Sequence, residues 1–280
     1  MSKIPEDEKV GPFFIRARPV KGGFASVVNE AGQRVMLFEG FDAEAPALEA
    51  ARAYATEQVA LRRPPPRAPS KRTSSSERVS LEDLRARFAT HFPQGFTDPA
   101  YLAKERDDKI GVRSELMEAV SLEAALHAGP AEAAAARAMF GKIRLSPFEI
   151  IRAQKTLASA DGPAFVRACA QLASGGDARA ALDAIEEAVR PHGAPSWTIA
   201  TYLPSLWAPE TCMLMRITAT TRVASWLGHA FAAQYNGRLD ADVYAGFMAF
   251  ARDLKDGLAD MSPRDLIDVQ GFIWVVSEYR

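Results

Sequence analysis

Three short segments near the start of the chain are rich in the aromatic and β-branched residues that favour strands. They are Phe13–Val20, Phe24–Val28 and Arg34–Phe38. The segments between them, 21–23 and 29–33, contain the glycines and the asparagine that suit tight turns. The pattern predicts three strands joined by two turns.

A helical pattern follows the third segment. Asp42 is suited to cap a helix that runs to about residue 60, with apolar side chains on one face. These side chains are Leu48, Ala51, Ala55 and Val59. Residues 11–60 are therefore predicted to form a β-β-β-α unit.

Ser80-Leu81-Glu82-Asp83 fits the start of a helix with acidic charge in its first turn. From Ser80 onward the apolar positions recur mostly at helical spacing. The predicted helices lie at 99–127, 131–140, 147–161, 163–174, 177–190, 219–232, 241–259 and 268–276. The interval 195–218 is rich in aromatic residues, proline and methionine, and its apolar run at 212–217 fits either a strand or a helix end. The fold class expected is α+β: a small three-stranded antiparallel sheet plus one helix, then a mostly α-helical domain.

The chain as a whole has a formal net charge of −1, but its charged residues are unevenly distributed along the sequence. Residues 61–80 hold six Lys or Arg and one Glu, and they include three consecutive prolines and a serine-rich stretch. Such a segment has little apolar surface to bury and favours an extended, mobile chain. We expect a domain at 1–60, a basic linker at 61–79 and a helical domain with an aromatic-rich carboxy-terminal module at 80–280.

The composition of the chain indicates the cellular compartment of the protein. No apolar run approaches the roughly 20 residues that span a bilayer, and the first residues lack the apolar core of a secretory signal. The two cysteines, Cys169 and Cys212, provide neither a disulfide framework nor a cysteine metal cluster. We expect a cytoplasmic protein that does not contact a membrane.

One candidate site is basic. Arg16 and Arg18 share a face of the first strand with Phe14, Lys21 lies in the following turn, and Arg34 is a neighbour from the third strand. The linker adds further basic residues directly afterwards. These are Arg62, Arg63, Arg67, Lys71 and Arg72. Such a set is suited to phosphate contacts, although the same residues also fit a merely solvated surface and linker.

The β-β-β-α order of residues 11–60, with its glycine-rich turn and Asn-x-x-Gly turn, resembles the small DNA-binding domains at the front of phage-type integrases. It also resembles small stand-alone sheet-plus-helix domains of unknown role. The integrase resemblance implies that one sheet face enters the major groove of DNA while basic residues contact phosphates. The spaced Arg, His-x-x-Arg and Tyr residues of a tyrosine-recombinase core are missing.

A second candidate site gathers polar and aromatic residues of the carboxy-terminal module. It comprises Trp197, Tyr202, Trp207, Arg216, His229, Arg264, Asp265, Asp268, Gln270 and Trp274. Residues 195–278 resemble a module of uncharacterised bacterial proteins, some of them associated with restriction-type or other DNA-related functions.

Asp265 and Asp268 share a helix face at i,i+3 spacing, and either Arg264 or Arg216 could clamp them. One interpretation is a cap and a buried ion pair that fix the last helix. The other is a pocket in which an arginine binds an anion and a carboxylate acts as an acid or base.

The motifs of common enzyme classes are missing. The chain has no P-loop, no Gly-x-Gly-x-x-Gly fingerprint and no Gly-x-Ser-x-Gly elbow, and its four histidines lack zinc-site spacing. We expect no cofactor and no metal. The favoured hypothesis is a non-enzymatic protein that binds nucleic acid, with DNA as one candidate partner, through the sheet and the basic linker, while the helical domain serves a protein partner or specificity. The alternatives are an interaction adaptor with an aromatic partner surface, and an enzyme with an Arg/Asp pocket.

Overall fold

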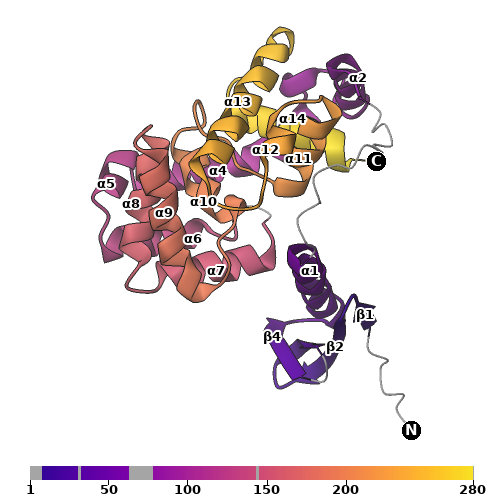
Figure 1. Ribbon diagram of the computed structural model, residues 1–280, viewed down its shortest axis with the longest axis vertical. Helices are drawn as coiled ribbons and strands as arrows, with labels where there is room; N and C mark the ends of the chain where they lie inside the picture. Colours follow the sequence, from indigo (N-terminus) through magenta and orange to yellow (C-terminus); the bar gives the residue numbers. More distant parts are fainter. Residues whose placement is uncertain (1–7, 31–32, 63–77, 143–144, 280) are drawn as a thin grey trace. The chain divides into compact units, whose positions relative to one another are not determined.

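A computed structural model of the chain describes residues 8–30, 33–62, 78–142 and 145–279 (Figure 1). The fold is α+β, with an antiparallel sheet and one helix followed by a helical region. The described residues form two compact units. Residues 8–62 together with Ser146–Phe148 make up the first, named the sheet unit, and the rest of residues 78–279 make up the second, named the helical unit.

The sheet has four antiparallel strands in the order β1-β2-β3-β4. They are β1 (Glu8–Val10), β2 (Phe13–Val20), β3 (Gly23–Glu30) and β4 (Gln33–Phe41). The three predicted strands are confirmed, but the expectation of a three-stranded sheet is wrong because β1 adds an edge strand. Its three residues, Glu-Lys-Val, are too few to show an alternating pattern, and only pairing with β2 reveals it.

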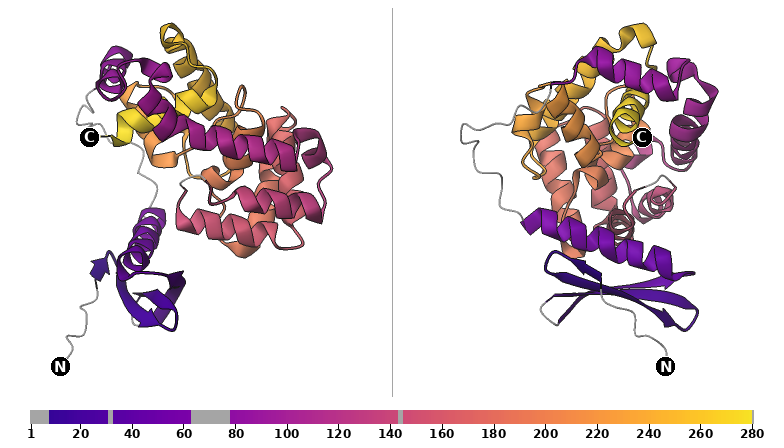
Figure 2. Two further views of the ribbon diagram at one scale, coloured as in Figure 1. Left: turned by 180° about the vertical axis from the view of Figure 1, so that it is seen from behind. Right: turned by 90° about the vertical axis from the view of Figure 1, so that its right-hand side faces the viewer.

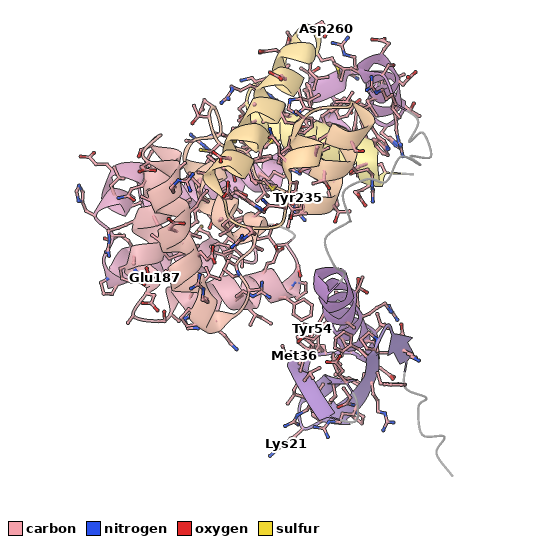
Figure 3. All side chains as sticks on the ribbon, viewed as in Figure 1. Lys21, Met36, Tyr54, Glu187, Tyr235 and Asp260 are labelled. Carbon is pink, nitrogen blue, oxygen red and sulfur yellow. The ribbon has the colours of Figure 1, made fainter. Side chains whose placement is uncertain are left out.

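One face of the sheet is covered by α1 (Glu44–Arg62), which packs against all four strands (Figure 2). Phe13 and Ile15 of β2 are fully buried on this face and pack in one cluster with Ala51 and Ala55 of α1. The small alanines let the helix approach the strands closely. Tyr54 of α1 and Met36 of β4, both labelled in Figure 3, also pack against this cluster.

The helical unit starts where the sequence predicts it. Ser80 caps α2 by accepting a hydrogen bond from the Asp83 amide, and the Asp83 carboxylate accepts one from the Ser80 amide. The first elements are α2 (Leu81–His91), α3 (Pro99–Tyr101), the π-helix η2 (Leu102–Arg106), α4 (Asp107–Ala119), α5 (Leu122–Leu126) and α6 (Pro130–Met139). The middle elements are α7 (Pro147–Leu157), α8 (Gly162–Ala173) and α9 (Ala178–Val189). The last are α10 (Trp197–Trp207), α11 (Ile217–Trp226), α12 (Phe231–Gln234), α13 (Ala241–Gly257) and α14 (Leu266–Glu278). Short 3-10 turns lie at Gly95–Thr97, Arg190–His192 and Ala259–Met261.

Two helices are buried on almost every side. Every residue of α10 is buried, and so are eleven of the thirteen residues of α14. Neither helix carries the polar stripe of a surface helix, which is why each lies inside the unit. The aromatic-rich interval that showed no helical period thus contains α10, with Pro204 in its last turn.

The apolar run that follows α10 is neither strand nor helix until α11 begins at Ile217. Met215 anchors it to α10, because its amide donates to the Thr201 hydroxyl at 2.9 Å and its carbonyl accepts from the Thr198 hydroxyl at 3.1 Å. Two threonines therefore replace the backbone partners that a strand would supply. Among the helices of the described ranges, none combines the length and apolar character needed to cross a membrane.

Candidate functional site

The outer face of the sheet, opposite α1, carries a row of aligned side chains. Lys9 pairs with Phe14, Phe14 with Asn29, and Asn29 with Arg34. Directly opposed residues of antiparallel strands share a face, so these four side chains cross all four strands in one line. Phe14 is 40% exposed at the centre of this row, and the Lys9 ammonium lies 5.7 Å from the centre of its ring.

Two further arginines extend the row along β2. Arg16 and Arg18 alternate with the buried Ile15 and Ala17, so both are exposed on the same face as Phe14. Lys21, labelled in Figure 3, is exposed in the turn between β2 and β3. The structure thus brings three of the predicted basic residues, Arg16, Arg18 and Arg34, to one side of the sheet, while Lys21 lies in the turn. Lys9, a further cation of that side, lies on the strand that the sequence pattern did not show.

Two acidic residues of the strands, Glu8 and Glu30, face the other way. Glu8 is paired with the inward-facing Ile15, and Glu30 with the inward-facing Phe13. The Glu8 carboxylate accepts two hydrogen bonds from Arg52 of α1, at 2.7 and 2.8 Å. Among these residues the charges are segregated, with Lys9, Arg16, Arg18 and Arg34 on the outer face of the strands and the Glu8–Arg52 ion pair on the helix side.

Only the two ends of the basic linker, residues 61–62 and 78–79, are described. Arg62 is the last residue of α1. Arg63, Arg67, Lys71 and Arg72 lie outside the described residues.

The predicted carboxylate pair of the carboxy-terminal module forms the centre of a buried ion-pair network. The Arg106 guanidinium donates two hydrogen bonds to Asp265, at 2.8 and 2.7 Å, and a third to Asp268 at 3.0 Å. Asp268 also accepts from the Tyr101 hydroxyl at 2.9 Å. Arg264 donates to Asp268 through its amide at 2.9 Å and its Nε at 2.8 Å.

The network has the properties of a structural cap. Asp265 is the N-cap of α14 and accepts hydrogen bonds from the amides of Ile267 and Asp268. Burial raises the pKa of the Asp265 carboxyl, but the hydrogen bonds and charge of Arg106 outweigh burial and hold that pKa below its ordinary value. Asp268 has no exposed surface. A substrate would therefore have to displace protein partners to reach either carboxylate.

Sequence reasoning identified Arg264, Asp265 and Asp268 but missed Arg106 and Tyr101. Tyr101 directly precedes the π-helix η2 and Arg106 is its last residue, at the point where the predicted helix at 99–127 changes its hydrogen-bond pattern. A π-helical turn is rare and frequently marks a functional or strained position. The only sequence signal is an arginine at a position that becomes buried, and periodicity does not show which arginine that is.

A second polar group lies beside the network, on α4 and its neighbours. Lys109 donates to the Glu105 carbonyl at 2.5 Å, and Tyr279 donates to the Glu105 carboxylate at 2.6 Å. Burial lowers the pKa of Lys109 to about 8, against the opposing charge of Glu105. Lys109 and Gln270 line a cavity of about 20 Å³, which has room for one water molecule. Arg216 packs instead over the Trp274 ring, at 5.0 Å.

The other predicted residues of the module are dispersed. Trp197 is buried in α10, the Tyr202 hydroxyl donates to the Met139 carbonyl at 2.6 Å, and the Trp207 indole donates to the Val120 carbonyl at 2.9 Å. His229 lies 3.2 Å from the Asp253 carboxylate. A partner that used the indoles of Trp197 and Trp207 would have to open the core of the helical unit. The larger hollow, of about 280 Å³ beside α6, is lined mainly by alanine and proline.

No group of three or more His, Cys, Asp or Glu side chains in the described part of the chain could hold a metal ion. Comparison with protein-family models, with curated proteins and with solved structures gave no match.

Proposed function

We propose that this chain is a non-enzymatic nucleic-acid-binding protein. The outer face of the sheet and the basic segment after α1 contact phosphates, and the helical unit serves a partner or specificity.

The segregation of charge in the sheet unit carries the proposal. Residues 1–60 hold more acidic than basic side chains, and on that count alone they would repel a polyanion. The register removes this objection for one face, because Lys9, Arg16, Arg18 and Arg34 lie together while Glu8 faces α1. Phosphate contacts from clustered Lys and Arg supply most of the affinity for nucleic acid.

The test is fluorescence anisotropy of a labelled DNA titrated with the full chain at low and moderate salt. Arg18→Gln removes a cation from the outer face, and Arg52→Gln removes one from the helix side. Each phosphate that a variant can no longer neutralise should make the slope of log affinity against log salt shallower by about 0.9. Arg18→Gln is expected to weaken binding and reduce this slope, while Arg52→Gln leaves both nearly unchanged.

The contribution of the basic linker is tested in the same titration. A variant with Arg67, Lys71 and Arg72 changed to glutamine should bind more weakly and with a smaller salt slope than wild type. Absence of salt-dependent binding by the wild-type chain at micromolar concentration would refute the proposal as a whole.

A further inference from the structure

The outer face of the sheet contains an exposed aromatic ring as well as positive charge. Phe14 shares its face with three cations, of which Lys9 and Arg16 are immediate neighbours and Arg34 lies two strands away, beyond Asn29. Lys9 stands directly opposite it, Arg16 follows two residues along the same strand, and Arg34 lies in the same cross-strand row. Phosphate contacts alone do not require the phenylalanine.

We infer that this face binds single-stranded nucleic acid, with a base stacked on Phe14 and the backbone held by the surrounding cations. The inference rests on the proposed function, because it names the form of nucleic acid that the same face takes. Proteins that bind single strands without sequence preference combine an aromatic side chain, on which a base stacks, with a positively charged track for phosphates.

The chemistry of the face favours a single strand over a duplex. In a duplex the flat faces of the bases are stacked on each other, so an aromatic side chain meets only base edges and phosphates. In a single strand the base faces are available. The row next to Phe14 continues this surface, because Arg16 is paired across the sheet with Val27, and Val27 with Leu37. Both apolar side chains are half-buried. Val35, in the bulge of β4, is 38% exposed.

For a base to stack on Phe14, the Lys9 side chain would have to move away from the ring. Its ammonium lies 5.7 Å from the centre of the Phe14 ring. An exposed cation–π contact is worth less than a base–aromatic stack, and lysine is long enough to turn its charge to a phosphate. A base can therefore replace the ammonium on the ring without loss of the positive charge beside it.

The experiment compares a labelled oligothymidylate of about 15 nucleotides, within the site sizes of small single-strand-binding folds, with a duplex of the same length. Both are titrated with the full chain and with three variants, Phe14→Leu, Phe14→Tyr and Arg18→Gln. Phe14 is exposed, so its substitution leaves the core of the sheet unit intact, and circular dichroism checks this.

The inference predicts that wild type binds the single strand more tightly than the duplex. Phe14→Leu should weaken single-strand binding at least about fivefold, the lower range for removal of one stack, and Phe14→Tyr should retain it. Arg18→Gln should weaken binding to both probes.

Two results would overturn the inference. If duplex binding equals or exceeds single-strand binding, or if Phe14→Leu binds as wild type does, the single-strand inference fails. If Arg18→Gln still weakens binding in that case, the proposed function survives. If neither probe binds in a salt-dependent way, both fail together.

Discussion

Removal of the Asp268 carboxylate is the most direct test of the buried network. In wild type this group accepts hydrogen bonds from the Tyr101 hydroxyl, the Arg106 guanidinium and both the amide and the side chain of Arg264. Asp268→Ala deletes these acceptors at once. Arg106 retains its two hydrogen bonds to Asp265, and the partly exposed Arg264 can turn toward water.

The expected destabilisation follows from what remains buried. Breaking a buried ion pair by removing one partner costs about 3–5 kcal/mol, because the remaining charge is left uncompensated. The Tyr101 hydroxyl, on a side chain with no exposed surface, is also left without this acceptor, which costs about 1–3 kcal/mol by itself. The two costs overlap and Arg106 keeps one carboxylate, so we expect the free energy of unfolding of the helical unit to fall by about 3–5 kcal/mol in total.

Tryptophan fluorescence during urea unfolding measures this unit selectively. All four tryptophans lie in it: Trp197, Trp207, Trp226 and Trp274. The matched control is Glu186→Ala, which removes an exposed i,i+4 ion pair with Arg190 in the same unit. An exposed pair of this kind contributes about 0.3–0.5 kcal/mol. If Asp268→Ala shifts the unfolding midpoint no more than Glu186→Ala does, the network does not stabilise the fold.

Acid provides a second test of the same network. Because the pKa of Asp265 is lowered in the folded state, its contribution to stability is complete above the ordinary value of 3.8 and is lost as pH falls through the folded value. Wild type should therefore lose stability below about pH 4. Asp265→Asn should be less stable than wild type at pH 6 and should show a shallower decline in acid. Parallel acid profiles for the two proteins would contradict the assignment.

Three further predictions concern buried groups of the helical unit. Burial lowers the pKa of Lys109 from 10.5 to about 8, so between these values the unfolded chain binds more protons, and wild type should gain about 2 kcal/mol between pH 8 and 9.5. Lys109→Met should lack this gain in urea melts, and identical profiles would refute the shift. The new Cβ of Gly271→Ala would lie 2.5 Å from the hydroxyl oxygen of the buried Tyr101, so this variant should lose about 1–3 kcal/mol of unfolding free energy. Gly111 has open space around it, so Gly111→Ala should gain about 0.5–1 kcal/mol. Equal shifts in the melting temperature of the two variants would contradict the packing. Burial raises the pKa of both thiols, Cys169 and Cys212, so neither should react with an aromatic disulfide reagent before unfolding, and rapid labelling of the folded chain would disprove their burial.

Local sequence signals were sufficient to predict most of the secondary structure of the sheet unit. The strand and turn residues of Phe13–Phe38 predicted three strands, and alternation in β2 predicted which side chains share a face. Alternation is a local property, because successive strand residues point to opposite sides whatever surrounds them. Only cross-strand register aligns Lys9 and Arg34 with Phe14, since pairing joins residues that the sequence separates.

In the helical unit, sequence signals predicted contacts between neighbouring residues but not contacts between residues that are distant along the chain. The cap at Ser80 and the carboxylate pair Asp265 and Asp268 were visible in the sequence, because caps and i,i+3 pairs involve neighbours along the chain. Arg106 and Tyr101 were not, since they reach Asp268 across more than 160 residues.

Sequence patterns were therefore enough to predict the α+β class, several helices and the candidate basic strand, although the helices expected at 99–127 and 219–232 are each interrupted and α10 was not predicted. Tertiary packing determines which charges are buried, because burial depends on helices that are distant along the chain. It assigned Asp265 and Asp268 to a satisfied cap and Trp197 to the core. It also aligned the cations of the sheet around an exposed phenylalanine, because register is a property of paired strands and not of any one of them.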